Sequence, residues 1–231
     1  MINTNESALF LFDAEIRKKY PITVGCDEAG RGPLAGPVVA AAVILSGKEN
    51  LPNLNDSKKI KEDTREKLYE EIYRQAEAVS FFCVSPKEID EINILNASLF
   101  AMYKSVTALK NKFGEAIVAN RILIDGNRYI KELDRDLQET VVKGDGKSAC
   151  IAAASIIAKV TRDRIMCEYA KEYRDFGFEK HKGYPTKAHY EAIERHGVLP
   201  IHRMSFLKKT LALPPHRAQP IEKEFRQLSL F

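Results

Sequence analysis

The sequence has no apolar run long enough to cross a membrane. Its longest uninterrupted apolar stretch covers only residues 38–45, whereas a membrane-spanning helix needs about 20 residues. The first 20 residues contain acidic side chains, and no basic segment precedes their short apolar patch, which excludes the usual pattern of a secretory signal peptide. We therefore expect a soluble protein of the cytoplasm.

The sequence also lacks paired cysteines. Its four cysteines lie at positions 26, 83, 150 and 167 and form no C-x-x-C motif. This spacing does not fit a zinc framework, and a chain of 231 residues is large enough to fold without a disulfide scaffold. Each cysteine is expected to be a small buried apolar side chain.

Internal repeats and low-complexity tracts are absent, and 45% hydrophobic with 29% charged residues is the composition of a globular protein. Alternating and helical apolar periodicities predict an α/β fold with one mixed five-stranded sheet, flanking helices and a helical C-terminal part. The predicted strands cover 23–28, 37–45, 79–84, 119–124 and 139–143, and the predicted helices cover 62–76, 96–112, 147–170 and 186–196. We divide the chain into an N-terminal segment (1–19), a main domain (20–209) and a flexible tail (210–231).

The positive charge is unevenly distributed. The whole chain carries +4, from 36 basic and 32 acidic residues, but residues 180–209 alone contain seven Lys/Arg against two Glu, a local +5. Such a basic segment is typical of a protein that binds a polyanion. A solvated helix face is the alternative explanation.

Three predicted strands end in a carboxylate close to glycine. The first ends at Asp27 and Glu28, the second at Asp125, and Asp145 follows the third. Functional sites of α/β sheets gather at the carboxyl ends of strands, so the repetition favours one convergent acidic site over three independent polar turns. Clustered carboxylates need a counter-cation, and oxygen ligands without thiolates favour Mg²⁺ or Mn²⁺, which commonly serve phosphate chemistry.

Two nucleotide-binding motifs are only approximated. Gly30-x-Gly32-x-x-Ala35 resembles a dinucleotide fingerprint, but prolines interrupt it and a strand, rather than a helix, follows. The segment from Gly146 to Ser148 resembles the end of a P-loop, but position 141 holds valine where that motif needs glycine. Neither motif predicts a nucleotide cofactor.

Seven segments together resemble bacterial ribonuclease HII and follow one another in the order of that family. They are VGCDEAGRGPLAGPVVAAAVIL, NDSKKI, EIDEINILNASLFAM, ILIDGNR, VVKGDGKS, AAASIIAKVTRDR and HKGYPTKAHY, and they span roughly residues 20–210. The resemblance implies a ribonuclease-H-like fold with a C-terminal helical extension. It also implies hydrolysis of RNA in RNA–DNA hybrids, and cutting on the 5′ side of single ribonucleotides in duplex DNA, with 3′-hydroxyl and 5′-phosphate ends. A monomeric enzyme that uses Mn²⁺ or Mg²⁺ is expected.

The resemblance also assigns site residues. The metal-binding acids of the family correspond to Asp27, Glu28 and Asp125, and the fourth active-site acid corresponds to Asp145. Asp163 is a rival for the fourth position, but it lies four residues after Lys159 on a predicted helix, where an ion pair explains it more simply. The stretch AAAS at 152–155 departs from the most familiar family pattern, and no role is expected for it.

Substrate contacts follow from the same resemblance. Gly30, Arg31 and Gly32 match the loop that senses the ribonucleotide, because glycine allows the backbone to approach a 2′-hydroxyl closely. Tyr184 matches the tyrosine that packs on the sugar at the RNA–DNA junction; a core tyrosine is the alternative. The candidate phosphate contacts are Lys58, Lys143, Lys180, Lys182 and Arg203. For Lys58, a solvated loop residue without a function is the alternative.

The last five residues, QLSLF, form an apolar cluster behind a proline-containing, basic segment. They resemble the short peptide by which bacterial repair proteins dock on the DNA sliding clamp. In that case Leu228, Leu230 and Phe231 would fill an apolar pocket and Gln227 would make polar contacts. A C-terminal peptide folded back on the domain is the alternative.

Overall fold

The computed structural model describes residues 7–55, 57 and 60–207. Its centre is a mixed five-stranded sheet in the order β3-β2-β1-β4-β5. The first three strands form an antiparallel meander, whereas β4 and β5 run parallel to β1. The strands are β1 (Thr23–Ala29), β2 (Val38–Ile44), β3 (Ala78–Val84), β4 (Arg121–Asp125) and β5 (Gln138–Val141). The predicted fold class is confirmed.

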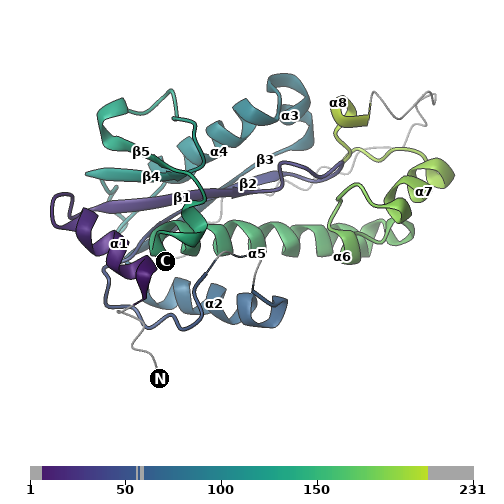
Figure 1. Cartoon of the computed structure of the whole chain (residues 1–231). Helices are drawn as coiled ribbons and strands as arrows, with labels where there is room; N and C mark the ends of the chain where they lie inside the picture. The colour runs from purple at the N-terminus through teal and green to yellow at the C-terminus, as the bar shows by residue number, and fades with distance from the viewer. Residues whose placement is uncertain (1–6, 56, 58–59, 208–231) are drawn as a thin grey trace.

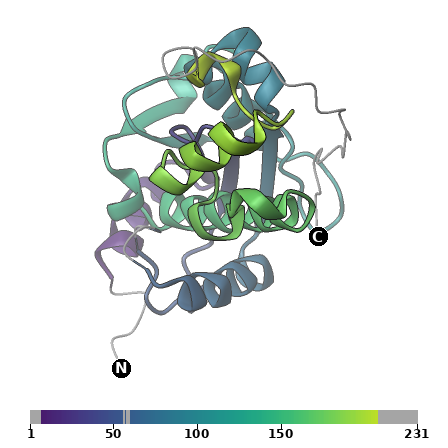
Figure 2. The ribbon, with the colours of Figure 1, turned by 90° about the vertical axis from the view of Figure 1, so that its right-hand side faces the viewer.

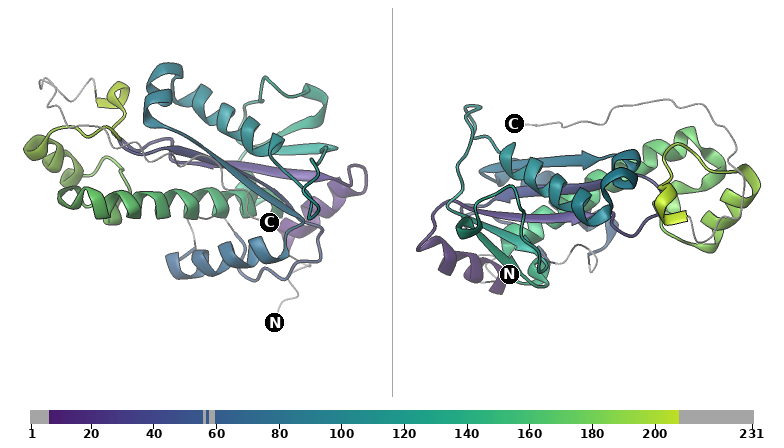
Figure 3. Two further views of the ribbon diagram at one scale, coloured as in Figure 1. Left: turned by 180° about the vertical axis from the view of Figure 1, so that it is seen from behind. Right: turned by 90° about the horizontal axis from the view of Figure 1, so that it is seen from above.

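Helices cover both faces of the sheet (Figures 1 and 3). The long helix α5 (Ala149–Glu172) lies on one face with α2 (Glu62–Gln75) outside it, and α3 (Pro86–Ile92) and α4 (Ile94–Thr107) cover the other. Strand β2 is buried on both sides: Val39 and Ala41 join the core under α5, whereas Ala40 and Ala42 join the core under α4. These small side chains allow both helix layers to approach the sheet closely.

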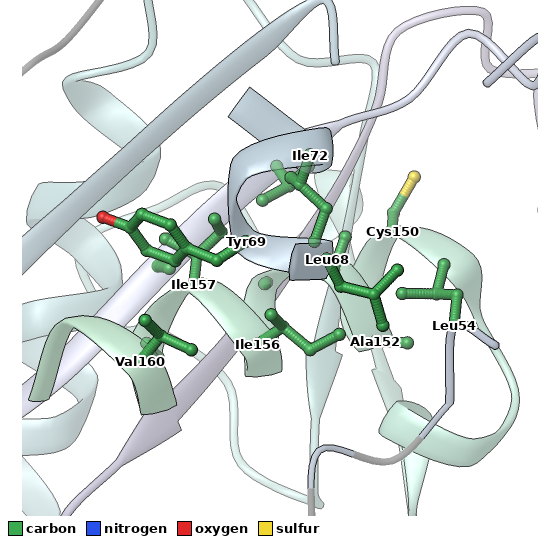
Figure 4. Packing of buried hydrophobic residues seen from close by; sticks show 14 of the residues in the cluster. Leu54, Leu68, Tyr69, Ile72, Cys150, Ala152, Ile156, Ile157 and Val160 are labelled. Atoms are coloured by element: carbon green, nitrogen blue, oxygen red, sulfur yellow. The ribbon is translucent and has the colours of Figure 1, made fainter. Parts of the chain in front are cut away.

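Helix α5 is held between the sheet and α2. Leu68 and Ile72 of α2 pack on the same core as Ile156 and Val160 of α5 (Figure 4). On the sheet side, a Cβ added at Gly25 of β1 would lie 2.2 Å from the carbonyl carbon of Cys150. Glycine at position 25 therefore permits contact between strand and helix backbones, which fixes α5 against the strand that carries Asp27.

The C-terminal part forms a small helical unit at one end of the sheet, where α5 projects beyond the strands (Figure 1); this end faces the viewer in Figure 2. It consists of the 3₁₀ turn η4 (Arg174–Phe176), α6 (Phe178–His181), α7 (Lys187–His196) and α8 (Met204–Leu207). Phe176, Phe178 and Ile193 form its own apolar core. The Thr186 hydroxyl accepts a hydrogen bond from the amide of His189 at 3.2 Å, as expected for the cap that begins α7.

Several elements differ from the sequence predictions. Helix α1 (Ala8–Arg17) was not predicted; the buried Asp13 carboxylate accepts the amide of Cys150 at 2.8 Å and so tethers α1 to the start of α5. The helix predicted over 96–112 ends at Thr107, because the Asn111 side chain accepts backbone amides of a tight turn instead. Cys167 is only partly buried, whereas the other three cysteines are buried and all four are free.

Short 3₁₀ turns precede and follow β5. They are η2 (Arg135–Leu137) and η3 (Gly144–Gly146). Strand β5 ends at Val141, before the predicted end at 143, because Lys143 adopts a left-handed conformation with φ 56°. Within the described part of the chain, no helix is both long enough and apolar enough to traverse a bilayer.

Candidate active site

Asp27 and Glu28 lie near the end of β1 and point to opposite faces of the sheet, as neighbours on a strand must. Asp27 is 4% exposed and faces α5, where the hydroxyl of Ser155 hydrogen-bonds its carboxyl group. Its Oδ1 also accepts the amide of Glu28 at 2.7 Å. Glu28 is bound less tightly, since its Oε1 lies 3.4 Å from Nη1 of Arg31.

Strand register brings Asp125 next to Asp27. Cys26 of β1 pairs with Ile124 of β4 in a parallel ladder, so the following residue of each strand is an aspartate beside the other. Oδ1 of Asp125 accepts the amide of Gly144 at 2.6 Å, and that bond holds η3 against the end of β4. Asp145 is the next residue of η3 and is 7% exposed. The four predicted acids therefore come from β1, β4 and η3 at one end of the sheet.

Glu28 and Asp125 also share a cavity of about 50 Å³. Arg31 and Arg128 lie at this cavity, together with Ser98 of α4. The Ser98 hydroxyl is buried and has no hydrogen-bond partner within the described residues. A buried polar atom without a partner is costly, so this cavity is suited to a polar occupant between the acids and the arginines.

Burial and the neighbouring acids raise the pKa of Asp27. The pKa of Asp27 lies well above its usual value, first because burial removes water from the carboxylate and then because Glu28 and Asp125 add negative charge. In the described residues, no three His, Cys, Asp or Glu side chains are gathered as a ready-made ion site. The donor set is nevertheless composed of carboxylate oxygens, which fits a hard divalent cation better than zinc.

Ser155 is a site residue that the sequence analysis missed. It hydrogen-bonds Asp27, and its Oγ lies 2.9 Å from Oγ of Ser57. A hydroxyl has one hydrogen to donate, so when Ser155 donates to Asp27, Ser57 donates to Ser155. These hydrogen bonds link Ser57 to Asp27 through Ser155. The predicted contact Lys58 itself lies outside the described residues.

The glycine loop and Tyr184 are neighbours in space. The amide of Leu34 donates to the carbonyl of Gly183 at 2.8 Å, and a Cβ added at Gly32 would lie 3.8 Å from Cε1 of Tyr184. Tyr184 is 39% exposed, so the alternative of a core tyrosine is wrong. The glycine backbone therefore lies next to an exposed aromatic ring, an arrangement that suits the approach of a ligand.

The other predicted contacts divide into two groups. Lys143 and Lys180 are exposed and free to meet a phosphate, whereas Nζ of Lys182 is engaged by the Glu179 carbonyl at 2.5 Å. Arg203 is fully buried, so its prediction as a phosphate contact is wrong. Asp163 forms the predicted ion pair with Lys159, at 2.8 Å.

Alanine substitutions separate the roles of two glycines. Gly30 has φ 97°, and a Cβ there would lie 2.2 Å from Nε of Arg162, so Gly30→Ala is expected to lower both melting temperature and activity. A Cβ at Gly32 makes only an ordinary contact, so Gly32→Ala should keep the melting temperature within about 2 °C. It should still reduce cleavage at least about tenfold, because the methyl group occupies the ligand space. Thermal unfolding and cleavage rates check both; equal activity loss without any stability difference would contradict this distinction.

A chain of neutral histidines supports the backbone of Tyr184. The amide of Leu199 donates to Nδ1 of His202 at 2.8 Å, which leaves the proton of His202 on Nε2, 3.1 Å from Nε2 of His189. His189 then accepts at Nε2 and donates from Nδ1 to the Tyr184 carbonyl at 3.0 Å. Burial, chiefly, lowers the pKa of His189 to about 4 and that of His202 to about 3.

These depressed pKa values predict that the two histidines make the fold sensitive to acid. Between about pH 6.5 and 4 the unfolded chain binds protons that the folded histidines exclude, so their contribution to stability falls as the pH falls through this window. The slope for His202 should approach about 1.4 kcal/mol per pH unit. Denaturant unfolding between pH 5 and 7.5 measures it. His202→Gln should flatten the profile, and the exposed His196→Asn on α7 is the control; an unchanged slope in His202→Gln would contradict the assignment.

Comparisons with known proteins identify the family of the chain. The family model for ribonuclease HII matches residues 24–209. The chain is 52% identical over 202 residues to a ribonuclease HII of Endomicrobium trichonymphae, which covers 87% of this chain and 92% of the relative.

Two solved structures share the fold. Ribonuclease H2 from Pyrococcus horikoshii OT3 is 28% identical with a TM-score of 0.62, covering 79% of this chain and 92% of that one. The ribonuclease HII of the PCNA:RNase HII complex from Archaeoglobus fulgidus is 26% identical with a TM-score of 0.63, covering 88% and 98%. The family model and the curated relatives therefore identify the chain as a member of the ribonuclease HII family, an endoribonuclease of the type 2 ribonuclease H class.

Proposed function

We propose that this enzyme cuts on the 5′ side of a ribonucleotide, including a single ribonucleotide embedded in duplex DNA, and leaves 3′-hydroxyl and 5′-phosphate ends. The observation that carries the proposal is the side-chain-free backbone of Gly32, four residues after Glu28 of β1, where an added Cβ would lie 3.8 Å from the exposed ring of Tyr184. A backbone free of side chains can approach a 2′-hydroxyl, which is the group that distinguishes RNA from DNA at one position.

The acids would hold the divalent cations of the reaction. Asp27, Glu28, Asp125 and Asp145 supply carboxylate oxygens, and the raised pKa of Asp27, caused by burial and by its acidic neighbours, shows that a nearby cation would stabilise the charged carboxylate. Mn²⁺ or Mg²⁺, when bound, would polarise the scissile phosphate and activate water. The chain itself orients these ligands through Ser155 on Asp27 and the Gly144 amide on Asp125.

The remaining contacts would position the duplex without reading its sequence. Lys143 precedes η3 and is exposed beside the acids, and Arg31 is half-exposed at the mouth of the cavity that Glu28 and Asp125 line. The positively charged side chains of Lys143 and Arg31 would contact the phosphate backbone. Such a protein would act as a monomer in the cytoplasm, where bacterial DNA is replicated and repaired.

A labelled duplex with one ribonucleotide tests the proposal. With Mn²⁺ or Mg²⁺ we expect one cut, 5′ of the ribonucleotide, and a product end that a DNA polymerase extends because it is a 3′-hydroxyl. EDTA should abolish cutting, and an all-DNA duplex should stay intact. Cutting only within long hybrids, or a 3′-phosphate end, would contradict the proposal. Comparing the two metals would also establish which one is preferred.

A second proposal concerns the tail, whose candidate residues Gln227, Leu228, Leu230 and Phe231 lie outside the described residues. We propose that the peptide QLSLF docks on the DNA sliding clamp; a ribonuclease HII of Archaeoglobus fulgidus has been solved in a complex with PCNA. Tethering would raise the enzyme's local concentration on DNA without changing the site. The 222–231 peptide should bind the clamp of the same cell, and its Leu230→Ala, Phe231→Ala version should not. Equal binding of both peptides would contradict the proposal.

A further inference from the structure

Two arginines of the described chain are completely buried, and among the described residues neither forms a salt bridge, although Asp163 lies near Arg162 and Asp90 near Arg203. Arg162 lies in α5 and Arg203 immediately precedes α8, and both are 0% exposed. Burial lowers the pKa of both guanidinium groups, and each is placed near the other, since the charge of Arg162 also lowers the pKa of Arg203. Buried arginine remains charged at neutral pH. Burying two charges without a salt bridge lowers the stability of the folded state, so the presence of these two arginines in the interior needs an explanation.

Arg162 links the glycine loop to the segment that carries Tyr184. Its Nε donates to the carbonyl of Pro37 at 3.0 Å and its Nη2 to that of Ala35 at 3.1 Å. Its Nη1 donates to the carbonyl of Lys182 at 3.0 Å. One rigid guanidinium therefore binds residues 35 and 37 and residue 182 at once. The Cζ atom of Arg162 also lies 5.7 Å from the centre of the Tyr184 ring.

Arg203 holds the other part of the same loop. Its Nη2 donates to the carbonyl of Gly30 at 2.7 Å, its Nη1 to that of Arg31 at 3.2 Å, and its Nε to that of Gly36 at 2.9 Å. Five carbonyls of the loop 30–37 thus turn toward two arginines. All peptide bonds of the described chain are trans, and in a trans peptide the N–H points opposite to the carbonyl. The amides of Arg31 and Gly32 consequently point away from Arg203.

We propose that Arg162 and Arg203 are positioning residues for ribonucleotide discrimination: together they lock the loop 30–37 against Tyr184 and aim the amides of Arg31 and Gly32 away from the core, toward the sugar. Only arginine offers several donors in one rigid plane, which explains why two charges are buried here. The inference rests on the proposed function, since it assumes that Gly32 and Tyr184 meet the ribonucleotide.

We call Arg162 and Arg203, with the loop carbonyls that they bind, the arginine clamp. Conservative substitutions test it. Arg162→Lys and Arg203→Lys keep the charge but cannot reach three carbonyls in one plane. On a duplex with one ribonucleotide, we expect kcat/KM to fall at least about thirtyfold. On a long RNA–DNA hybrid the loss should stay within about fivefold, because every position there offers a 2′-hydroxyl and a displaced loop can still find one. Arg164→Lys is the matched control; Arg164 is an exposed arginine of α5 that pairs with Glu66.

The two substrates separate the possible outcomes. If both activities fall by the same factor, in step with the melting temperature, the arginines serve only the fold and the proposal is overturned. Failure of both lysine variants to fold would overturn it in the same way. If the wild-type enzyme does not cut the single-ribonucleotide duplex, the proposed function fails, and the clamp is then judged by a measurement that needs no activity.

Fluorescence supplies that measurement, because the sequence contains no tryptophan. Tyr184→Trp introduces a single reporter at the end of the clamp. Adding Arg162→Lys should raise acrylamide quenching of the introduced tryptophan at least about twofold, since the segment 182–184 would lose the guanidinium bond at Lys182 and keep only the backbone bond between Leu34 and Gly183 to the loop 30–37. Adding Arg164→Lys should leave quenching unchanged. Equal quenching in all three proteins would show that Arg162 does not fix the position of residue 184 and would overturn the proposal.

Discussion

Asp125→Asn is expected to reduce cleavage at least about a thousandfold under saturating Mg²⁺ or Mn²⁺. The change removes one negative ligand, and the polarising contribution of a catalytic metal is worth several kcal/mol, where each 1.36 kcal/mol corresponds to tenfold in rate. The amide oxygen of asparagine can still accept the Gly144 amide that Asp125 binds at 2.6 Å. Duplex affinity and the fold should therefore persist, as gel shift and thermal unfolding would show.

Stability in EDTA gives an independent check of the same variant. Asp125 raises the pKa of Asp27 by adding negative charge, so its removal should relieve repulsion and hold or raise the melting temperature of the metal-free protein. Added Mg²⁺ should stabilise the wild type more than the variant. Asp136→Asn, exposed beyond the opposite end of β4, should match the wild type in every assay. Near wild-type cleavage by Asp125→Asn would exclude Asp125 as a ligand.

The position of the acids could be predicted because each lies near the end of a strand or, for Asp145, in the turn that follows one. Apolar runs that stop at Asp27 and Asp125 indicate strand ends, and parallel pairing of β1 with β4 places those ends together. The prediction needed only local pattern and one rule of sheet topology. The side-chain partners of the acids could not be predicted, because the hydroxyl of Ser155 comes from α5, a helix that is buried on nearly all sides and so shows no distinct functional face.

The arginine clamp was hidden for a different reason. Arg162 and Arg203 lie among charged and apolar residues that look like an ordinary helix and a basic segment, and sequence analysis assigned Arg203 to phosphate binding. Their partners are backbone carbonyls 125 to 173 residues away in the chain, apart from Lys182. Every residue has a backbone carbonyl, so no residue type in the sequence indicates such an acceptor. Only the folded structure shows that the guanidinium groups of Arg162 and Arg203 point into the protein.

Tyr184→Ala is expected to reduce cleavage of a single-ribonucleotide duplex by roughly tenfold to a hundredfold, because aromatic stacking on a nucleotide is worth about 1–3 kcal/mol. The melting temperature should change by less than about 3 °C, since the ring is 39% exposed and the backbone there is held by His189 rather than by the ring. Tyr184→Phe should retain most activity. Tyr190→Ala, which removes a ring packed on the C-terminal core, should show the reverse pattern, with stability lost and activity per folded molecule kept. Parallel losses of stability and activity in Tyr184→Ala would contradict this prediction and indicate that the Tyr184 ring serves the fold.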